Sequence, residues 1–333
     1  MVEEKRRPWR RWVVLVLMIA GFIIGGFLVP VQPYISVKAE NLLGEGHPWL
    51  FGLPLVNTLP TLALTIILIV WLAWATNRSL RQSERTDLVP RGVGNLMETF
   101  FEMLYNLTEG SAGVKWAKAI FPWFATIMFY VLFANLLKLI PGFESIGVIH
   151  HTEAAGAGHA IQPLFGNWSS IQPGAGDYIL APFFRGISVN LNFTAALAII
   201  AVVAIQVIGF RAQGFGYLSK FFNTRTMFKT PFFGAMDFLV GLLELISELS
   251  KILSFAFRLF GNMFAGVVLV AIVAGLLGKI SILPAMIMMF ELFVGIIQAF
   301  VFGMLTMVFM AQATQGHGHE EEHSEAQAEA HEI

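Results

Sequence analysis

The sequence predicts an all-α polytopic membrane protein with about six transmembrane helices. Hydrophobic residues make up 56% of the 333 residues and charged residues only 13%, whereas a soluble domain carries about a quarter charged residues. The apolar residues also gather in stretches of about 20 or more, the length that crosses a ~30 Å hydrocarbon core. No cysteine is present, which excludes disulfides and thiolate-bound metals.

The expected crossings cover residues 11–29, 54–76, 119–140, 188–210, 235–277 and 283–311. The fifth is too long for one helix perpendicular to the bilayer, so we expect a steeply tilted helix, locally loosened near Gly261. The sixth follows after a short connection and therefore runs antiparallel to the fifth. The last two helices are thus expected to be long, tilted and antiparallel.

Residues 1–30 are expected to form a basic N-terminus followed by an uncleaved, signal-anchor-like first span. A cleaved signal sequence is the alternative, but no small-x-small cleavage site follows Val29, and Pro30 and Pro33 come next. Residues 31–312 then form the membrane-embedded core, and residues 313–333 form a cytoplasmic tail.

Lysine and arginine residues predict the orientation, because they accumulate in cytoplasmic loops. Of the 21 in the chain, fifteen lie before the first span or in the connections between spans two and three and spans four and five. Four lie on or near the other side: Lys38, Lys138, Arg185 and Lys279. Both termini are therefore expected in the cytoplasm.

Two connections are predicted to be interfacial. Residues 92–109 place Leu96, Phe100 and Leu107 on one helical face, which is typical of an amphipathic helix lying along the membrane surface. Residues 215–233, rich in Phe with scattered Lys and Arg, are also expected at the interface. Residues 141–187 are expected to form an irregular cap that could include short strands.

The C-terminal tail mixes four histidines with glutamates. Histidine-rich tracts can bind metals, but this spacing fixes no coordination geometry. A solvated, disordered tail is therefore the favoured interpretation.

A polar stripe follows one face of the fifth span. Residues three, four and seven apart share a helical face, and the stripe consists of Glu244, Glu248, Lys251, Arg258 and Asn262, flanked by Ser247 and Ser254. Arg258 cannot lose its charge, and a cation at the bilayer centre costs from about 3 to more than 10 kcal/mol. Such a charge indicates a function inside the membrane.

The sixth span carries Glu291, Gln298 and Thr306 on one face. In an antiparallel pair, Arg258 and Gln298 can meet near mid-depth, with Glu291 displaced toward the outside and Glu244 toward the cytoplasm. Carboxylates in wet crevices can pass protons, and a fixed cation between two crevices would block a direct leak.

Structural alternatives stay open for the weaker candidates. Glu244, Glu248 and Lys251 could neutralise one another as a salt-bridge ladder near the cytoplasmic interface. Four polar residues of spans three and four could line an outer vestibule or form hydrogen bonds between helices: Asn135, Lys138, Asn190 and Asn192.

The run from Arg258 to Gly266, Arg-Leu-Phe-Gly-Asn-Met-Phe-Ala-Gly, resembles the signature of subunit a of F-type ATP synthases. The resemblance covers roughly residues 90–311. It implies that Arg258 faces the carboxylates of a rotating c-ring, that Gln298 lies opposite it, and that Asn262 is a polar position one turn beyond. By the same resemblance, Glu244, Ser247 and Lys251 belong to the cytoplasmic half-channel. Asn135 and Asn190 match an outer-vestibule asparagine and a fourth-span motif.

The resemblance implies a stator subunit that feeds ions through two offset half-channels to the c-ring, with peripheral-stalk b subunits as further partners. ATP catalysis would lie in partner subunits, and no cofactor, metal or nucleic acid is implied. The location would be a bacterial cell membrane. Whether the ion is H⁺ or Na⁺ depends mainly on the ring's binding site.

Three positions depart from the family pattern: Lys138 and Ser188 stand where aspartate is common, and Val267 stands where an acid or histidine is common. Glu291 is therefore the main candidate carboxylate for access from outside.

Two other function classes compete. A secondary transporter could use Arg258 to bind an anionic substrate at the midplane, but it predicts inverted repeats that the sequence does not display. An assembly scaffold would make the polar stripe purely structural.

Overall fold

The computed structural model describes residues 12, 39–42, 54–85, 92–140, 143–151, 158–166, 168–220, 231–277 and 282–315. Within these residues, five helices are long and apolar enough to cross a membrane. The prediction of a helical, polytopic membrane protein is thereby confirmed, although the fold is mostly helical and not all-α, because it also contains a sheet. The expected first span, apart from Trp12, and the tail from residue 316 onward lie outside the described residues. Residues 313 and 314, expected to belong to the disordered tail, are helical.

The first three spanning helices are α2 (Thr58–Arg85), α3 (Val93–Leu137) and α4 (Leu191–Gln213). Helix α3 contains both the amphipathic segment and the third span. The two parts meet at Gly113, whose φ of 72° and ψ of 161° are not helical. Only glycine adopts such a conformation at little cost, so the sequence permits the break at this position.

The amphipathic segment does not present a uniform apolar face to its surroundings. Leu104 is fully buried against the rest of the protein, whereas Leu96 and Met103 are exposed. The amphipathic segment is therefore packed against the rest of the protein at Leu104, and other apolar side chains of the segment are exposed.

The last two spanning helices are α5 (Pro231–Leu277) and α6 (Ile282–Thr314). Helix α5 continues without interruption through Gly261, so the expected loosening there is wrong. Between α4 and α5 lies a short 3₁₀ segment, η2 (Gly214–Lys220), and η1 (Ile187–Val189) precedes α4.

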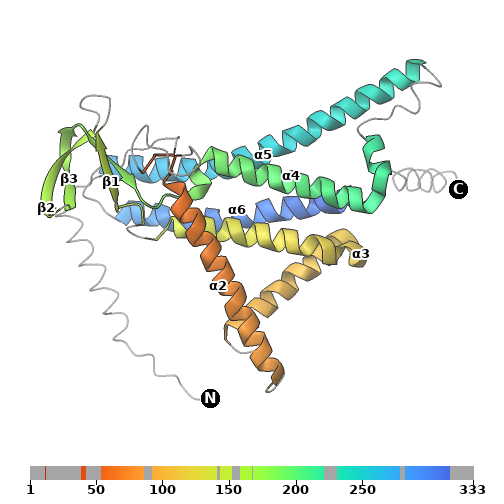
Figure 1. Ribbon diagram of the computed structural model, residues 1–333, viewed down its shortest axis with the longest axis horizontal. Helices are drawn as coiled ribbons and strands as arrows, with labels where there is room; N and C mark the ends of the chain where they lie inside the picture. Colours follow the sequence, from red (N-terminus) through yellow and green to blue (C-terminus); the bar gives the residue numbers. More distant parts are fainter. Residues whose placement is uncertain are drawn as a thin grey trace. The chain divides into compact units, whose positions relative to one another are not determined.

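The segment expected to be an irregular cap contains a four-stranded antiparallel sheet with strand order β1-β4-β2-β3. The strands are β1 (Gly147–His151), β2 (Gly158–Phe165), β3 (Trp168–Gly176) and β4 (Tyr178–Pro182), drawn as arrows in Figure 1. Gly158 lies directly against the backbone of Tyr178 in β4. A side chain at Gly158 would therefore push the two strands apart.

The chain divides into two compact units. The first includes the sheet, the segment that follows α3, and the parts of α5 and α6 within Met263–Val294. The second includes most of α2, all of α3 and α4, and the remaining parts of α5 and α6.

The second unit has a tightly packed helical core. Phe124 of α3, Ile205 of α4 and Phe302 of α6 have at most 1% of their surface exposed. Gly303 of α6 lies directly against Phe124 and Met128 of α3. Small residues let membrane helices approach closely, and van der Waals contact then holds them together.

Candidate functional site

Helices α5 and α6 contact each other through aromatic rings beside the polar stripe. The ring of Phe255 lies 5.0 Å from that of Phe302 and 5.9 Å from that of Phe309, measured between centroids. Phe255 and Leu259 are almost completely buried. These contacts fix the rotation of α5, so Arg258, which lies between them in the sequence, projects from the edge of the packed face.

Arg258 is half-buried, and its guanidinium Nη2 donates to the hydroxyl of Ser254, one turn earlier, over 3.3 Å. Across the described part of the chain, no carboxylate forms an ion pair with Arg258. A permanent cation whose observed partner is a neutral hydroxyl keeps most of its charge available to another molecule.

Asn262 and Gln298 join α5 to α6 one turn beyond Arg258. The Asn262 amide Nδ2 donates to Gln298 Oε1 over 2.7 Å. Gln298 is 4% exposed, and its Nε2 has no hydrogen-bond partner. The sequence suggested that Gln298 meets Arg258, but the observed hydrogen bond of Gln298 is with Asn262. The Gln298 Nε2 donor is left without a partner one turn beyond Arg258.

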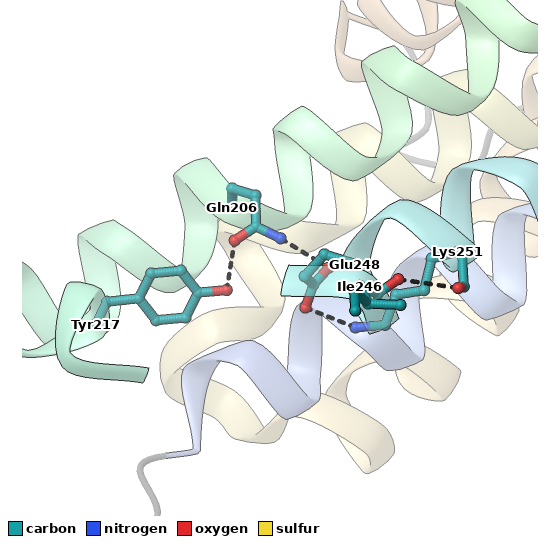
Figure 2. Close-up of polar contacts among 6 residues, drawn as sticks. Gln206, Tyr217, Ile246, Glu248 and Lys251 are labelled. Carbon is teal, nitrogen blue, oxygen red and sulfur yellow. Dashed lines mark hydrogen bonds and ion pairs between the residues drawn. The ribbon is translucent and has the colours of Figure 1, made fainter. Parts of the chain in front are cut away.

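A second polar cluster surrounds Glu248, which is only 6% exposed. Lys251 Nζ donates to Glu248 Oε1, and Gln206 Nε2 of α4 donates to Glu248 Oε2, each over 2.8 Å. The hydroxyl of Tyr217 in η2 donates to Gln206 Oε1, also over 2.8 Å. Figure 2 shows Gln206 and Lys251 reaching the carboxylate of Glu248, and Tyr217 reaching Gln206 from its other side.

Gln206 and Tyr217 are residues that the sequence reasoning missed. A signal for Gln206 was present, since it is the one polar side chain in the apolar run between Thr194 and Arg211 of α4. Tyr217 had no comparable signal, because its importance depends on how η2 folds back against α4.

Glu244, Ser247 and Ser250 lie along the same part of α5. Glu244 is half-buried, and Ser247 is exposed. Ser250 donates to the carbonyl of Ile246 on its own helix. Ser250 is thus satisfied locally, while Ser247 lies on an open surface of α5.

Glu291 forms a buried ion pair with Lys138, a residue just beyond α3. The distance from Lys138 Nζ to Glu291 Oε2 is 3.5 Å, and the two side chains are 3% and 10% exposed. Lys138 Nζ also lies 3.5 Å from the carbonyl oxygen of Met263. The second carboxylate oxygen, Oε1, is buried without a partner and lies against Gly266 of α5.

Asn135 and Asn190 have structural contacts. Asn135 is 1% exposed and donates through Nδ2 to the carbonyl of Gly295 in α6 over 3.1 Å. Asn190 is the N-cap of α4, and its Oδ1 accepts from the backbone N–H of Asn192 over 3.0 Å. Thr306 likewise donates to its own helix, at Phe302. Of these three, Asn135 makes the hydrogen bond between two helices that its structural alternative describes.

Among the residues that the structure describes, no three His, Asp or Glu side chains gather as metal ligands. What the residues offer is a half-buried cation on α5 and two buried carboxylates, Glu248 and Glu291, each beside a lysine.

Comparison with known proteins gives a consistent result. Residues 59–311 match the family model described as ATP synthase A chain. A protein called "ATP synthase subunit a" from Campylobacter jejuni subsp. jejuni serotype O:23/36 is 30% identical over 263 residues, covering 77% of this chain and 90% of that one. Proteins with the same name from Desulfotalea psychrophila and Mycobacterium ulcerans are 31% and 28% identical, over 70% and 84% of this chain and 76% and 96% of their own length.

Proposed function

The chain belongs to the ATP synthase A chain family, a non-catalytic subunit of the proton-translocating membrane sector, and from this premise we propose a division of labour along α5 and α6. In this proposal Arg258 separates two half-channels that lead to opposite sides of the membrane. The other subunits needed are a c-ring whose members each carry an acidic residue, and peripheral-stalk b subunits that keep this chain from turning.

The proposal rests on the partners of the Arg258 guanidinium. Its guanidinium touches the Ser254 hydroxyl and forms no ion pair with a carboxylate of the described residues. A cation in an apolar helix is costly, and that cost falls when an anion approaches. A ring carboxylate that passes Arg258 would therefore be stabilised as the anion and would release its proton there.

In this proposal the buried carboxylates of Glu291 and Glu248 belong to the outer and the cytoplasmic half-channel, which together form the ion path. Glu291, paired with Lys138, would take ions from outside, and Glu248, with Glu244 and Lys251 nearby on α5, would release them to the cytoplasm. Torque follows because the ring carboxylate is neutral in contact with lipid and charged only beside Arg258. The orientation proposed with this path places both termini in the cytoplasm.

The test is the Arg258→Ala substitution in the complete ATP synthase, with ATP-driven proton pumping measured in inverted membrane vesicles. We expect pumping to be abolished while this chain still copurifies with the complex. Arg258→Lys should retain at most a small fraction of the activity, because a lysine can lose its charge beside a buried site. Arg211→Ala is the matched control, since Arg211 is exposed at the end of α4.

Normal pumping by Arg258→Ala would contradict the proposal and favour an assembly scaffold. A secondary transporter with a midplane arginine would instead give solute uptake that depends on Arg258 in membranes without the catalytic subunits. No contact in the described residues favours that second function.

A further inference from the structure

The hydrogen-bonded chain that runs from Tyr217 through Gln206 to Glu248 has no role in the chemistry of Arg258 described above. It joins three elements, η2, α4 and α5, within the second unit (Figure 2). Each link is 2.8 Å long, which is near the optimum for a hydrogen bond. This series of hydrogen bonds ends at the carboxylate of Glu248, which the proposed function assigns to the cytoplasmic half-channel.

The direction of the Gln206 amide is set by the carboxylate. An ionised carboxylate only accepts hydrogen bonds, so the Gln206 nitrogen must face Glu248. The Gln206 oxygen then faces the other way, toward Tyr217, whose hydroxyl has to donate. A turned amide would place its oxygen against the Glu248 carboxylate, so the hydrogen bond to Glu248 would be lost. The Tyr217 hydroxyl, by donating to Gln206 Oε1, favours the observed orientation of the amide.

The position of the Tyr217 hydroxyl is in turn set by packing. Tyr217 is 3% exposed, and its ring lies against the backbone of α4 at Gly209. A Cβ atom at position 209 would be 2.6 Å from two of the ring's carbons. Because Gly209 has no side chain, the ring of Tyr217 packs directly against α4, and this packing sets the position of its hydroxyl.

Glu248 thus has each carboxylate oxygen held by a different helix. Lys251 holds Oε1 from α5 itself, and Gln206 holds Oε2 from α4. The ammonium group of Lys251 also lies 4.8 Å above the ring centroid of Phe309 on α6. A carboxylate bound from two sides has one orientation, and a fixed orientation speeds proton exchange with a defined neighbour.

We propose that Gln206 and Tyr217 are positioning residues of the cytoplasmic half of the ion path, which act by holding the Glu248 carboxylate in place. This inference rests on the proposed function, because it assigns to Glu248 a part in proton release. Neither residue touches the moving proton. Their effect on transport passes entirely through Glu248.

The alternative is a structural role, called a clamp here, in which the Gln206–Glu248 hydrogen bond only holds α4 against α5. Both roles predict that loss of the hydrogen bond lowers activity, so one substitution cannot separate them. A clamp would act whether or not residue 248 can carry a proton. A positioning residue loses its effect once residue 248 no longer takes part, and a double-mutant cycle measures this difference.

The experiment uses the complete ATP synthase in inverted vesicles, with pumping normalised to the amount of assembled complex. Tyr217→Phe removes one hydroxyl and keeps the ring packed against α4. We expect pumping to fall about threefold to tenfold, the effect expected from one neutral hydrogen bond. Gln206→Met, with a side chain of similar length and no donor, should give at least the same loss.

In the Glu248→Gln background, Tyr217→Phe should cause no further loss. If that background pumps too little to measure, the unfolding temperature of the solubilised complex is compared instead, since a clamp predicts that Tyr217→Phe lowers it in the Glu248→Gln background and a positioning role does not. The matched control is Tyr105→Phe, because the ring of Tyr105 packs against Phe121 in α3, at 5.4 Å between centroids. That variant should pump like the unchanged protein.

Two results would overturn the inference and leave the proposed function intact, provided that Arg258→Ala still abolishes pumping. These are normal pumping by both Tyr217→Phe and Gln206→Met, and equal fractional losses in the presence and absence of Glu248. Normal pumping by Glu248→Gln would overturn the inference together with the proposed part of Glu248 in proton release. Normal pumping by Arg258→Ala would instead remove the proposed function itself.

Discussion

At the scale of single residues, charge and burial could be read from the sequence, but partners could not. Arg258 was identifiable because one permanent cation stands in a long apolar run, and its cost there is large. The Lys138–Glu291 pair was not, because the two residues are far apart in the chain and only the packing of the segment that follows α3 against the Glu291 part of α6 brings them together. Helical spacing predicts neighbours on one helix and leaves contacts between helices undetermined.

The Lys138–Glu291 pair gives a prediction about stability. Lys138→Met leaves a buried carboxylate without its cation, and breaking a buried pair in this way costs about 3–5 kcal/mol. We expect less assembled complex and a lower unfolding temperature of the detergent-solubilised complex. The double variant Lys138→Met/Glu291→Gln should recover much of this loss, because no uncompensated charge remains.

Recovery of the unfolding temperature in the double variant would show that the loss in Lys138→Met comes from the unpaired Glu291 carboxylate. If Lys138→Met unfolds at the same temperature as the unchanged protein, the pair contributes nothing to stability. If the double variant is as unstable as Lys138→Met, the defect does not come from the carboxylate. Pumping by the double variant should stay low in either case, since Glu291 is the proposed carboxylate for access from outside.

At the scale of helices and strands, the sequence predicted apolar helices well and the sheet poorly. The spans were visible because their length is set by the bilayer. The strands carry proline and glycine at several positions, and β2 pairs with β3 through register shifts near His159 and Pro163. An interrupted register removes the alternation of period two by which strands are recognised.

Gly266 of α5 leaves room for the carboxylate of Glu291 on α6, because glycine has no side chain. A Cβ atom at Gly266 would collide with Oε1 of Glu291 and lie 2.9 Å from its Cδ. We therefore expect Gly266→Ala to displace the Glu291 carboxylate and to lower ATP-driven proton pumping severalfold or more at equal amounts of complex.

The matched control for Gly266→Ala is Gly110→Ala in α3, where a Cβ atom would meet no other atom within 4 Å. Alanine is favoured over glycine in a helix by about 1 kcal/mol, so this variant should pump normally and be no less stable. Equal activity of the two alanine variants would show that the space beside Glu291 does not matter for transport.

At the scale of the whole molecule, the positions of lysine and arginine predict which side each connection faces. The chain has no cysteine, so single cysteines can be introduced without removing any. Ser169 in β3 and Glu98 in α3 are both exposed. We expect a membrane-impermeant thiol reagent to label Ser169→Cys from outside intact cells and Glu98→Cys only in inverted vesicles.

Labelling of both variants from the same side would contradict the proposed orientation, in which an odd number of crossings separates the two positions. The control is the unchanged chain, which should not react from either side. The result is independent of the tests on Arg258 and Glu248, because it measures the path of the chain and not its activity.

The end of α6 is fastened to the end of α4 by one side chain. Gln213 Nε2 donates to the backbone carbonyls of Ala313, over 3.0 Å, and Gln315, over 3.2 Å, where a helix end has carbonyls without partners of their own. In the proposed function this chain stays still beside a rotating c-ring and would feel a sideways reaction force. The contacts of Gln213 with the end of α6 and of Gln206 with Glu248 of α5 would then transfer part of this force to α4.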